Sequence, residues 1–146
     1  MILDLETGEL KRLIMVAVAW SDKLNIGIAK VDEEHQKLVE ILNQLDEAMR
    51  TGKGSRIMGE ILSQLVEYTK FHFASEEELM IEAEYPKLKL HQAQHRQLVE
   101  KVEKLNKKFH NSGQRITKET MEFLKYWLTN HILVDDMALG KFVNGE

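Results

Sequence analysis

The feature that most limits the fold of this chain is a three-and-four spacing of apolar residues that is interrupted by histidines. His91 and His95 lie on such a stripe, where leucines would be expected; its other members are Leu88, Leu98, Val102, Leu105 and Phe109. Residues four apart on a helix differ by about 40° in rotation and about 6 Å in rise, so both imidazoles face one side. Because a stripe of this kind packs against an interior, the pattern predicts a helix with two inward histidines.

The same spacing recurs in three further segments. The first predicted helix covers about 33–50 after an Asp32 N-cap, and the second covers about 55–83. The third contains His91 and His95 and ends near 111–113. The fourth covers 117–142 after a Thr117 N-cap. No strand alternation and no internal repeat is found. We therefore expect an all-α, up-down-up-down four-helix bundle over residues 20–146, preceded by an N-terminal extension or arm over residues 1–19.

Composition excludes several classes of function. The 146 residues suffice for one domain, the net charge of −4 argues against nucleic acid and anionic membranes, and the lack of cysteine excludes thiolate metal sites. The apolar run 13–20 is too short to span a bilayer, and the acids before it are unlike a secretory signal. The expected location is the cytoplasm.

Each of the four predicted helices carries polar residues on its inner stripe: His35; His72 and Glu76; His91 and His95; His131 with an aspartate. A lone histidine at such a position is more often a satisfied core residue, but five imidazoles and two carboxylates together favour a metal site. A buried glutamate is the stronger indication, because buried carboxylates need a partner or a cation. Glu77 and Glu78 are expected to form a solvated acidic face, and His110 is assigned no role.

Seven ligands are too many for one ion, but they suit two ions if both carboxylates bridge. With the histidines divided three and two, one ion would be six-coordinate and the other would keep a position for a small ligand. The partner of His131 is uncertain from spacing alone. Asp135, four residues on, suits an ideal helix, whereas Asp136 requires a π-type widening of the fourth helix.

The sequence resembles the hemerythrin family, most closely the bacterial hemerythrins. The resemblance spans Trp20 to about Phe142 and rests on His35 in Asp32-Glu-Glu-His35, His72-x-x-x-Glu76, His91-x-x-x-His95 and His131-x-x-x-x-Asp136. It implies a non-heme di-iron centre with a bridging oxo or hydroxo group. One iron would be held by His91, His95 and His131 and the other by His35 and His72, with Glu76 and Asp136 bridging.

The resemblance also implies that O2 is the ligand and that Trp127, Leu128 and Ile132 line its pocket. It favours Asp136 over Asp135. Leu139 stands where many bacterial relatives carry a tyrosine, which puts any hydrogen bond of that tyrosine in doubt.

The function expected from these features is O2 carriage, storage or sensing by a protein that is not an enzyme. The alternatives are a di-iron oxidoreductase acting on peroxide or nitric oxide, and an iron-binding protein for homeostasis. Donor type alone does not select iron, because divalent metals compete for such a site. A sensor would need a signalling domain in a larger chain, and the sequence does not decide between a monomer and a homo-oligomer.

Overall fold

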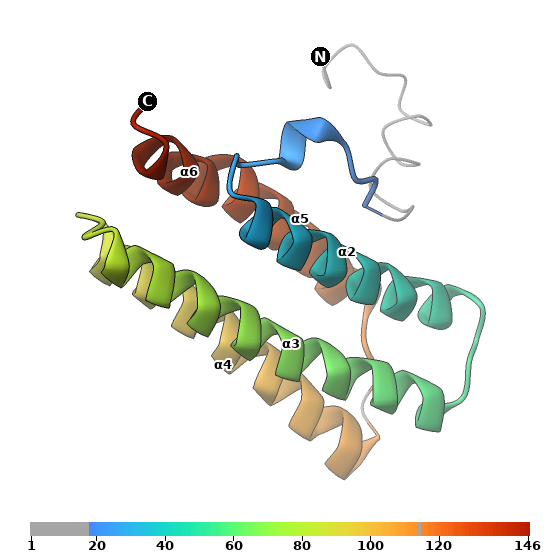
Figure 1. Ribbon diagram of the computed structural model, residues 1–146. Helices are drawn as coiled ribbons and strands as arrows, with labels where there is room; N and C mark the ends of the chain where they lie inside the picture. Colours follow the sequence, from blue (N-terminus) through green and yellow to red (C-terminus); the bar gives the residue numbers. More distant parts are fainter. Residues whose placement is uncertain (1–17, 114) are drawn as a thin grey trace.

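A computed structural model describes residues 18–113 and 115–146, and in this part of the chain every regular element is helical. The long helices are α2 (Ala29–Arg50), α3 (Ser55–Glu82) and α4 (Leu88–Ser112); the fourth rod consists of α5 (Lys118–Asn130), η3 (His131–Asp136) and α6 (Met137–Val143). Successive rods run in opposite directions and lie side by side (Figure 1). The predicted up-down-up-down bundle is therefore confirmed.

The ends of the helices agree with the predicted ones except at the start of the first. The Thr117 side chain caps α5 by accepting the backbone N–H of Thr120, as predicted. The Asp32 N-cap prediction is wrong, because α2 begins four residues earlier than expected, at Ala29. Asp32 lies in the first turn instead, and its carboxylate turns back to accept the N–H groups of Ile26 and Gly27.

Residues 18–28 form an arm that includes the short 3-10 helix η2 (Asp22–Leu24) and passes over the bundle beside α2 and α6 (Figure 1). Leu24 and Ile26 are buried, so the arm contributes to the core. Its backbone approaches Gly140 of α6 so closely that a Cβ there would lie 2.0 Å from the Ile26 carbonyl oxygen. The prediction for residues 1–17 lies outside the described residues.

The fourth rod contains the π-helical segment η3, which was the condition for Asp136 rather than Asp135 to face the interior with His131. Asp136 is fully buried. In this segment a residue and the fifth after it share a face, because the helix is widened. The predicted widening is confirmed. None of the described helices is both long enough and apolar enough to cross a membrane.

Candidate metal centre

The structure brings the seven predicted ligand residues together in the interior of the bundle, each with at most 3% of its surface exposed: His35, His72, Glu76, His91, His95, His131 and Asp136. Among the described residues they form two groups, and within each group the ligand atoms lie within 4.8 Å of one another. One group holds His91, His95 and His131, the other holds His35 and His72, and both contain Glu76 and Asp136.

In the three-histidine group, the imidazole Nε2 atoms surround one oxygen of each carboxylate. His91 Nε2 lies 2.8 Å from Glu76 Oε1 and 2.8 Å from Asp136 Oδ1. His95 Nε2 lies 3.1 Å from Glu76 Oε1, and His131 Nε2 lies 3.3 Å from Asp136 Oδ1. The His95 and His131 Nε2 atoms are themselves 3.1 Å apart.

The two-histidine group uses the other oxygen of each carboxylate. His35 Nε2 lies 2.9 Å from Asp136 Oδ2 and 3.6 Å from Glu76 Oε2. His72 Nε2 lies 3.3 Å from Glu76 Oε2. Each carboxylate thus presents one oxygen to each group, which is the arrangement that two bridging carboxylates require.

The polar atoms of the two-histidine group lack hydrogen-bond partners although they are buried. This holds for His35 Nε2, His72 Nε2, Glu76 Oε2 and Asp136 Oδ2, since even the close pairs among them do not have hydrogen-bond geometry. A buried polar atom without a partner costs about 1–3 kcal/mol. A cation bound between these atoms would satisfy all four. Imidazole and carboxylate donors suit first-row transition metals, so the residues fit a pair of metal ions.

The carboxylates raise the pKa of three of the imidazoles, and for His35 the neighbouring Asp136 and Glu76 outweigh burial. Burial lowers the pKa of His72, but its hydrogen bond with Glu34 and the nearby Glu76 carboxylate outweigh burial and raise this pKa to about 9. Burial likewise lowers the pKa of His91, and Asp136 and Glu76 raise it to about 10. Metal coordination requires neutral imidazole, so a metal ion must displace these protons.

The remaining shifts follow the same competition between burial and charge. Burial would raise the pKa of Glu76, but the surrounding imidazoles, His35 first, hold it well below its usual value. For His131 burial dominates and lowers the pKa. Glu76 is therefore ionised, as a bridging ligand must be.

Three acids outside the seven hold the histidine rings in place. The Nδ1–H of His72 donates to Glu34 at 2.8 Å, and that of His131 donates to Asp135 at 2.9 Å. The Nδ1–H of His95 donates to Glu77 at 2.8 Å. Such bonds fix the tautomer and leave Nε2 free for the metal.

The expectation that Glu77 belongs to a solvated acidic face is therefore wrong. Its side chain is only 25% exposed and reaches from α3 to His95 on α4. Glu34 was not selected from the sequence either. The usable signal was its position directly before His35 in the acidic run 32–34. Asp135 lies beside the cluster but in neither group of ligand atoms.

The O2 pocket predicted at Trp127, Leu128 and Ile132 stays a prediction. Trp127 stacks on the His131 ring with centroids 4.5 Å apart. Leu128 and Ile132 are buried. Phe73, which was not predicted to line the pocket, stacks on His95 with centroids 3.8 Å apart. Leu139, in place of the family's tyrosine, is fully buried and packs with Met80 and Tyr85.

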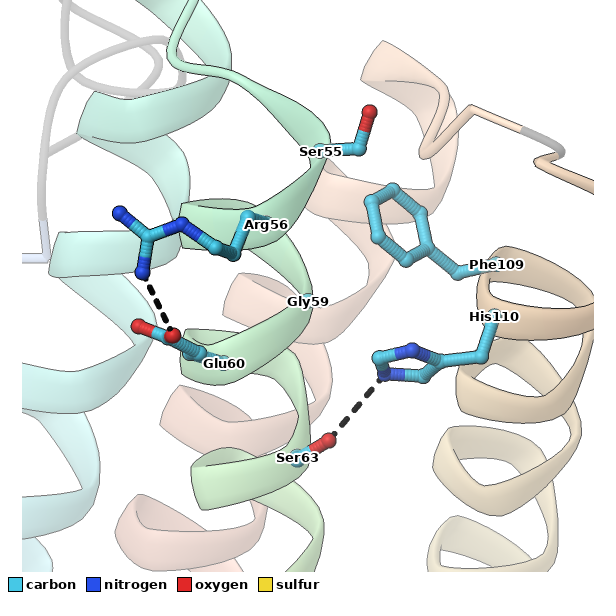
Figure 2. Close-up of a pocket in the computed structure, with 7 residues that line it drawn as sticks. All are labelled: Ser55, Arg56, Gly59, Glu60, Ser63, Phe109 and His110. Carbon is cyan, nitrogen blue, oxygen red and sulfur yellow. Dashed lines mark hydrogen bonds and ion pairs between the residues drawn. The ribbon is translucent and has the colours of Figure 1, made fainter.

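His110 lies apart from the cluster, as expected. It is exposed at the end of α4, and its Nε2 forms a 3.2 Å hydrogen bond with the Ser63 hydroxyl. Figure 2 shows it in a surface hollow between α3 and α4, where Arg56 and Glu60 form an ion pair of 3.0 Å. Gly59 lets the two helices approach here, because a Cβ would lie 2.8 Å from the His110 ring.

Comparisons with known proteins agree with this geometry. Residues 26–143 match the family model described as the Hemerythrin HHE cation binding domain. The chain is 40% identical over 132 residues to a bacteriohemerythrin of Stenotrophomonas maltophilia, covering 90% of this chain and 85% of that protein. It is 36% identical over 122 residues to a bacteriohemerythrin of Pseudomonas aeruginosa, covering 84% of this chain and 78% of that protein.

The fold is also shared with a solved structure. The crystal structure of a wild-type hemerythrin superposes with a TM-score of 0.81 at 29% sequence identity, covering 86% of this chain and 97% of that one. The family model covers most of the chain, and the polar cluster lies inside the matched range. The chain therefore belongs to the hemerythrin family.

Proposed function

We propose that this protein binds O2 reversibly at a non-heme di-iron centre and that it is not an enzyme. The proposal rests on a difference in the number of histidines between the two groups of ligand residues. Both share Glu76 and Asp136, but one has three histidines and the other has two. If Glu76 and Asp136 each bind both ions, the ion at His35 and His72 has one protein ligand fewer than the other ion. It can therefore accept a small molecule.

The seven residues act as ligands in this proposal: His91, His95 and His131 for one iron, His35 and His72 for the other, and Glu76 and Asp136 for both. Two ferrous ions would supply the electrons that O2 needs to bind. The protein's own contribution is to hold the ions in unequal coordination and to keep the imidazoles oriented through Glu34, Glu77 and Asp135.

The surroundings of the cluster favour binding over turnover. The Phe73 ring lies beside both groups, with its centroid 5.7 Å from that of His72 and 3.8 Å from that of His95. Leu128 and Ile132 are buried, and Trp127 stacks on the His131 ring. Apolar walls exclude water and provide no general acid, so a bound O2 would meet no proton donor from these side chains. Reduction of O2 to free peroxide needs protons, and their exclusion is what reversible binding requires.

The proposal extends to the protein's cellular location and to its role in O2 use. We place the protein in the cytoplasm, where it would carry, store or sense O2. Sensing would require a signalling domain as its partner. Peroxide or nitric oxide turnover and iron homeostasis are the competing roles.

The test is to load the protein anaerobically with ferrous iron and then expose it to O2. The proposal predicts two iron ions per chain and a visible absorption band that appears with O2 and disappears when O2 is removed. Irreversible oxidation with consumption of added peroxide or nitric oxide would support an oxidoreductase instead. Two bound ions without any O2-dependent band would support iron homeostasis.

A further inference from the structure

A hollow between α2 and α5 lies at the end of the bundle away from the metal groups and contains none of the seven ligand residues. The last two turns of α2 and the first two turns of α5 line it, with Asp46, Met49, Arg50, Lys118, Met121, Glu122 and Lys125. Within each helix these residues are three or four apart and therefore share one face. The hollow is thus formed by two helix faces that oppose each other.

A buried ion pair forms part of this wall. Lys125 Nζ lies 2.9 Å from Asp46 Oδ2, and the two side chains are only 9% and 3% exposed. Arg50 Nε lies 3.4 Å from the same oxygen. The charge of Asp46 is therefore compensated within the protein, and this carboxylate does not need a cation from solution.

The charged residues around the hollow leave an excess of one positive charge. Three of them are cations and two are acids. A guanidinium has five N–H donors, so Arg50 keeps terminal N–H groups that can bind a carboxylate while its Nε faces Asp46. Lys118 is exposed and forms no ion pair with any described residue. These two residues can receive the head of a monoanion.

The size and lining of the hollow select the body of such an anion. Its volume is about 130 Å³, and the wall surface is almost entirely apolar. The lysines and Arg50 therefore line it with their carbon stems, and their charged ends lie at the rim. An apolar cavity of about 150 Å³ holds one benzene molecule. Thioethers such as those of Met49 and Met121 make favourable contacts with aromatic rings.

We propose that this hollow is a second ligand site, specific for a small aromatic monocarboxylate. The ring would lie between Met49 and Met121, and the carboxylate would bind Arg50 and Lys118 at the rim. An apolar pocket with a few polar groups at its edge is the usual form of a small-molecule site. The proposal depends neither on iron nor on O2, so it can hold or fail independently of the proposed function.

Sodium benzoate is the probe, and the methionine methyl groups report where it binds. The protein is loaded with Zn²⁺, which is diamagnetic and suits imidazole and carboxylate ligands, and its methionines are labelled with ¹³C at the methyl group. Titration with benzoate should shift the Met49 and Met121 signals to saturation with one dissociation constant. Met80, one helical turn from Glu76, should not shift.

Three analogues separate the contributions of ring and charge. Benzamide keeps the ring without the charge, benzylamine reverses the charge, and acetate keeps the charge without the ring. Each should bind at least about tenfold more weakly than benzoate, because each lacks one of the two parts that the hollow recognises.

Lys118→Glu tests the rim. It changes the net charge around the hollow from +1 to −1 and should weaken benzoate binding about tenfold. Lys30→Glu is the matched control, because Lys30 is also an exposed lysine in the first turn of a helix but lies at the other end of α2. An acid in the first turn is favourable to a helix, so both variants should fold. Lys30→Glu should bind benzoate like the wild type.

Several results would overturn the proposal. Shifts at Met80 without shifts at Met49 and Met121 would place benzoate at the metal groups instead. Linear shifts without saturation would show that no site exists. Equal binding of benzoate and benzamide, or equal weakening in Lys118→Glu and Lys30→Glu, would show that the charges at the rim do not select an anion.

Discussion

The two halves of the bundle use the same four rods but are held together in different ways. The half away from the cluster is filled by fully buried apolar side chains such as Leu45, Leu62 and Met121. The half with the cluster encloses five imidazoles and two carboxylates, and five of their buried atoms lack hydrogen-bond partners. Apolar burial stabilises the first half without any ligand, whereas the second requires cations to compensate its polar atoms.

The far half also shows how the chain compensates a buried charge without a metal. Asp46 is 2% exposed, and its Oδ2 lies 2.9 Å from Lys125 Nζ and 3.4 Å from Arg50 Nε. This buried carboxylate therefore has two cations supplied by the protein. Glu76 and Asp136 face imidazoles alone, whose charge depends on pH. The contrast supports the interpretation that the cluster is built for metal ions.

The largest expected effect is on iron content, and it distinguishes Asp136 from Asp135. Asp136→Asn should reduce the iron content from two ions per chain to less than one, because both oxygens of Asp136 serve a metal group and an amide nitrogen is not a ligand. Asp135→Asn is the control and should retain two ions under saturating iron. Metal analysis after loading and gel filtration measures this. Loss of iron from Asp135→Asn alone would make Asp135 the bridging residue.

Leu45→Ala tests the apolar half. Leu45 is fully buried in the core and is not part of the metal cluster. Its truncation should lower the free energy of unfolding by about 2–5 kcal/mol. Iron content should stay at two per chain, because the ligand residues are untouched. Urea unfolding and metal analysis measure the two quantities, and loss of iron would show that the halves are not independent.

Metal affinity should depend steeply on pH. With pKa values of about 9 for His72 and about 10 for His91, both imidazoles are protonated at pH 7 in the metal-free protein. Each proton displaced makes the apparent affinity rise about tenfold per pH unit, so two protons give up to about 100-fold between pH 7 and pH 8. Calorimetry in buffers of different ionisation enthalpy counts the protons. Release of none at pH 7 would contradict the raised pKa values.

Glu77→Gln should have the smallest effect. The amide keeps a hydrogen bond to His95 Nδ1 but loses the charge, and such changes lower metal affinity by about 10–100-fold. Glu78→Gln is the matched control, because Glu78 is exposed on the same helix. Competition with a chelator measures both variants. Equal affinities would show that the Glu77 carboxylate does not support the metal site.

Periodicity made the bundle and its polar interior predictable. Because His35, His72, His91 and His131 occupy core positions, the helices that bring them inward also bring them together. The π-helical segment was predictable only through the family resemblance, which favoured Asp136 over Asp135. His131 and Asp136 can share one face only if the helix is widened.

Other features depend on contacts that no periodicity encodes. Glu77 occupies an outward position on α3, but its long side chain reaches His95 on the neighbouring helix. Asp32 has the composition of an N-cap, yet the arm supplies the backbone N–H groups that it accepts.

The most direct test of the central claim is the Mössbauer spectrum of the protein loaded anaerobically with ferrous 57Fe. Two groups that share both carboxylates but differ by one histidine should give two distinct ferrous signals of equal area, with two ions per chain. On addition of a small ligand, the account predicts that one signal shifts more than the other. A single signal, or one ion per chain at saturation, would contradict it.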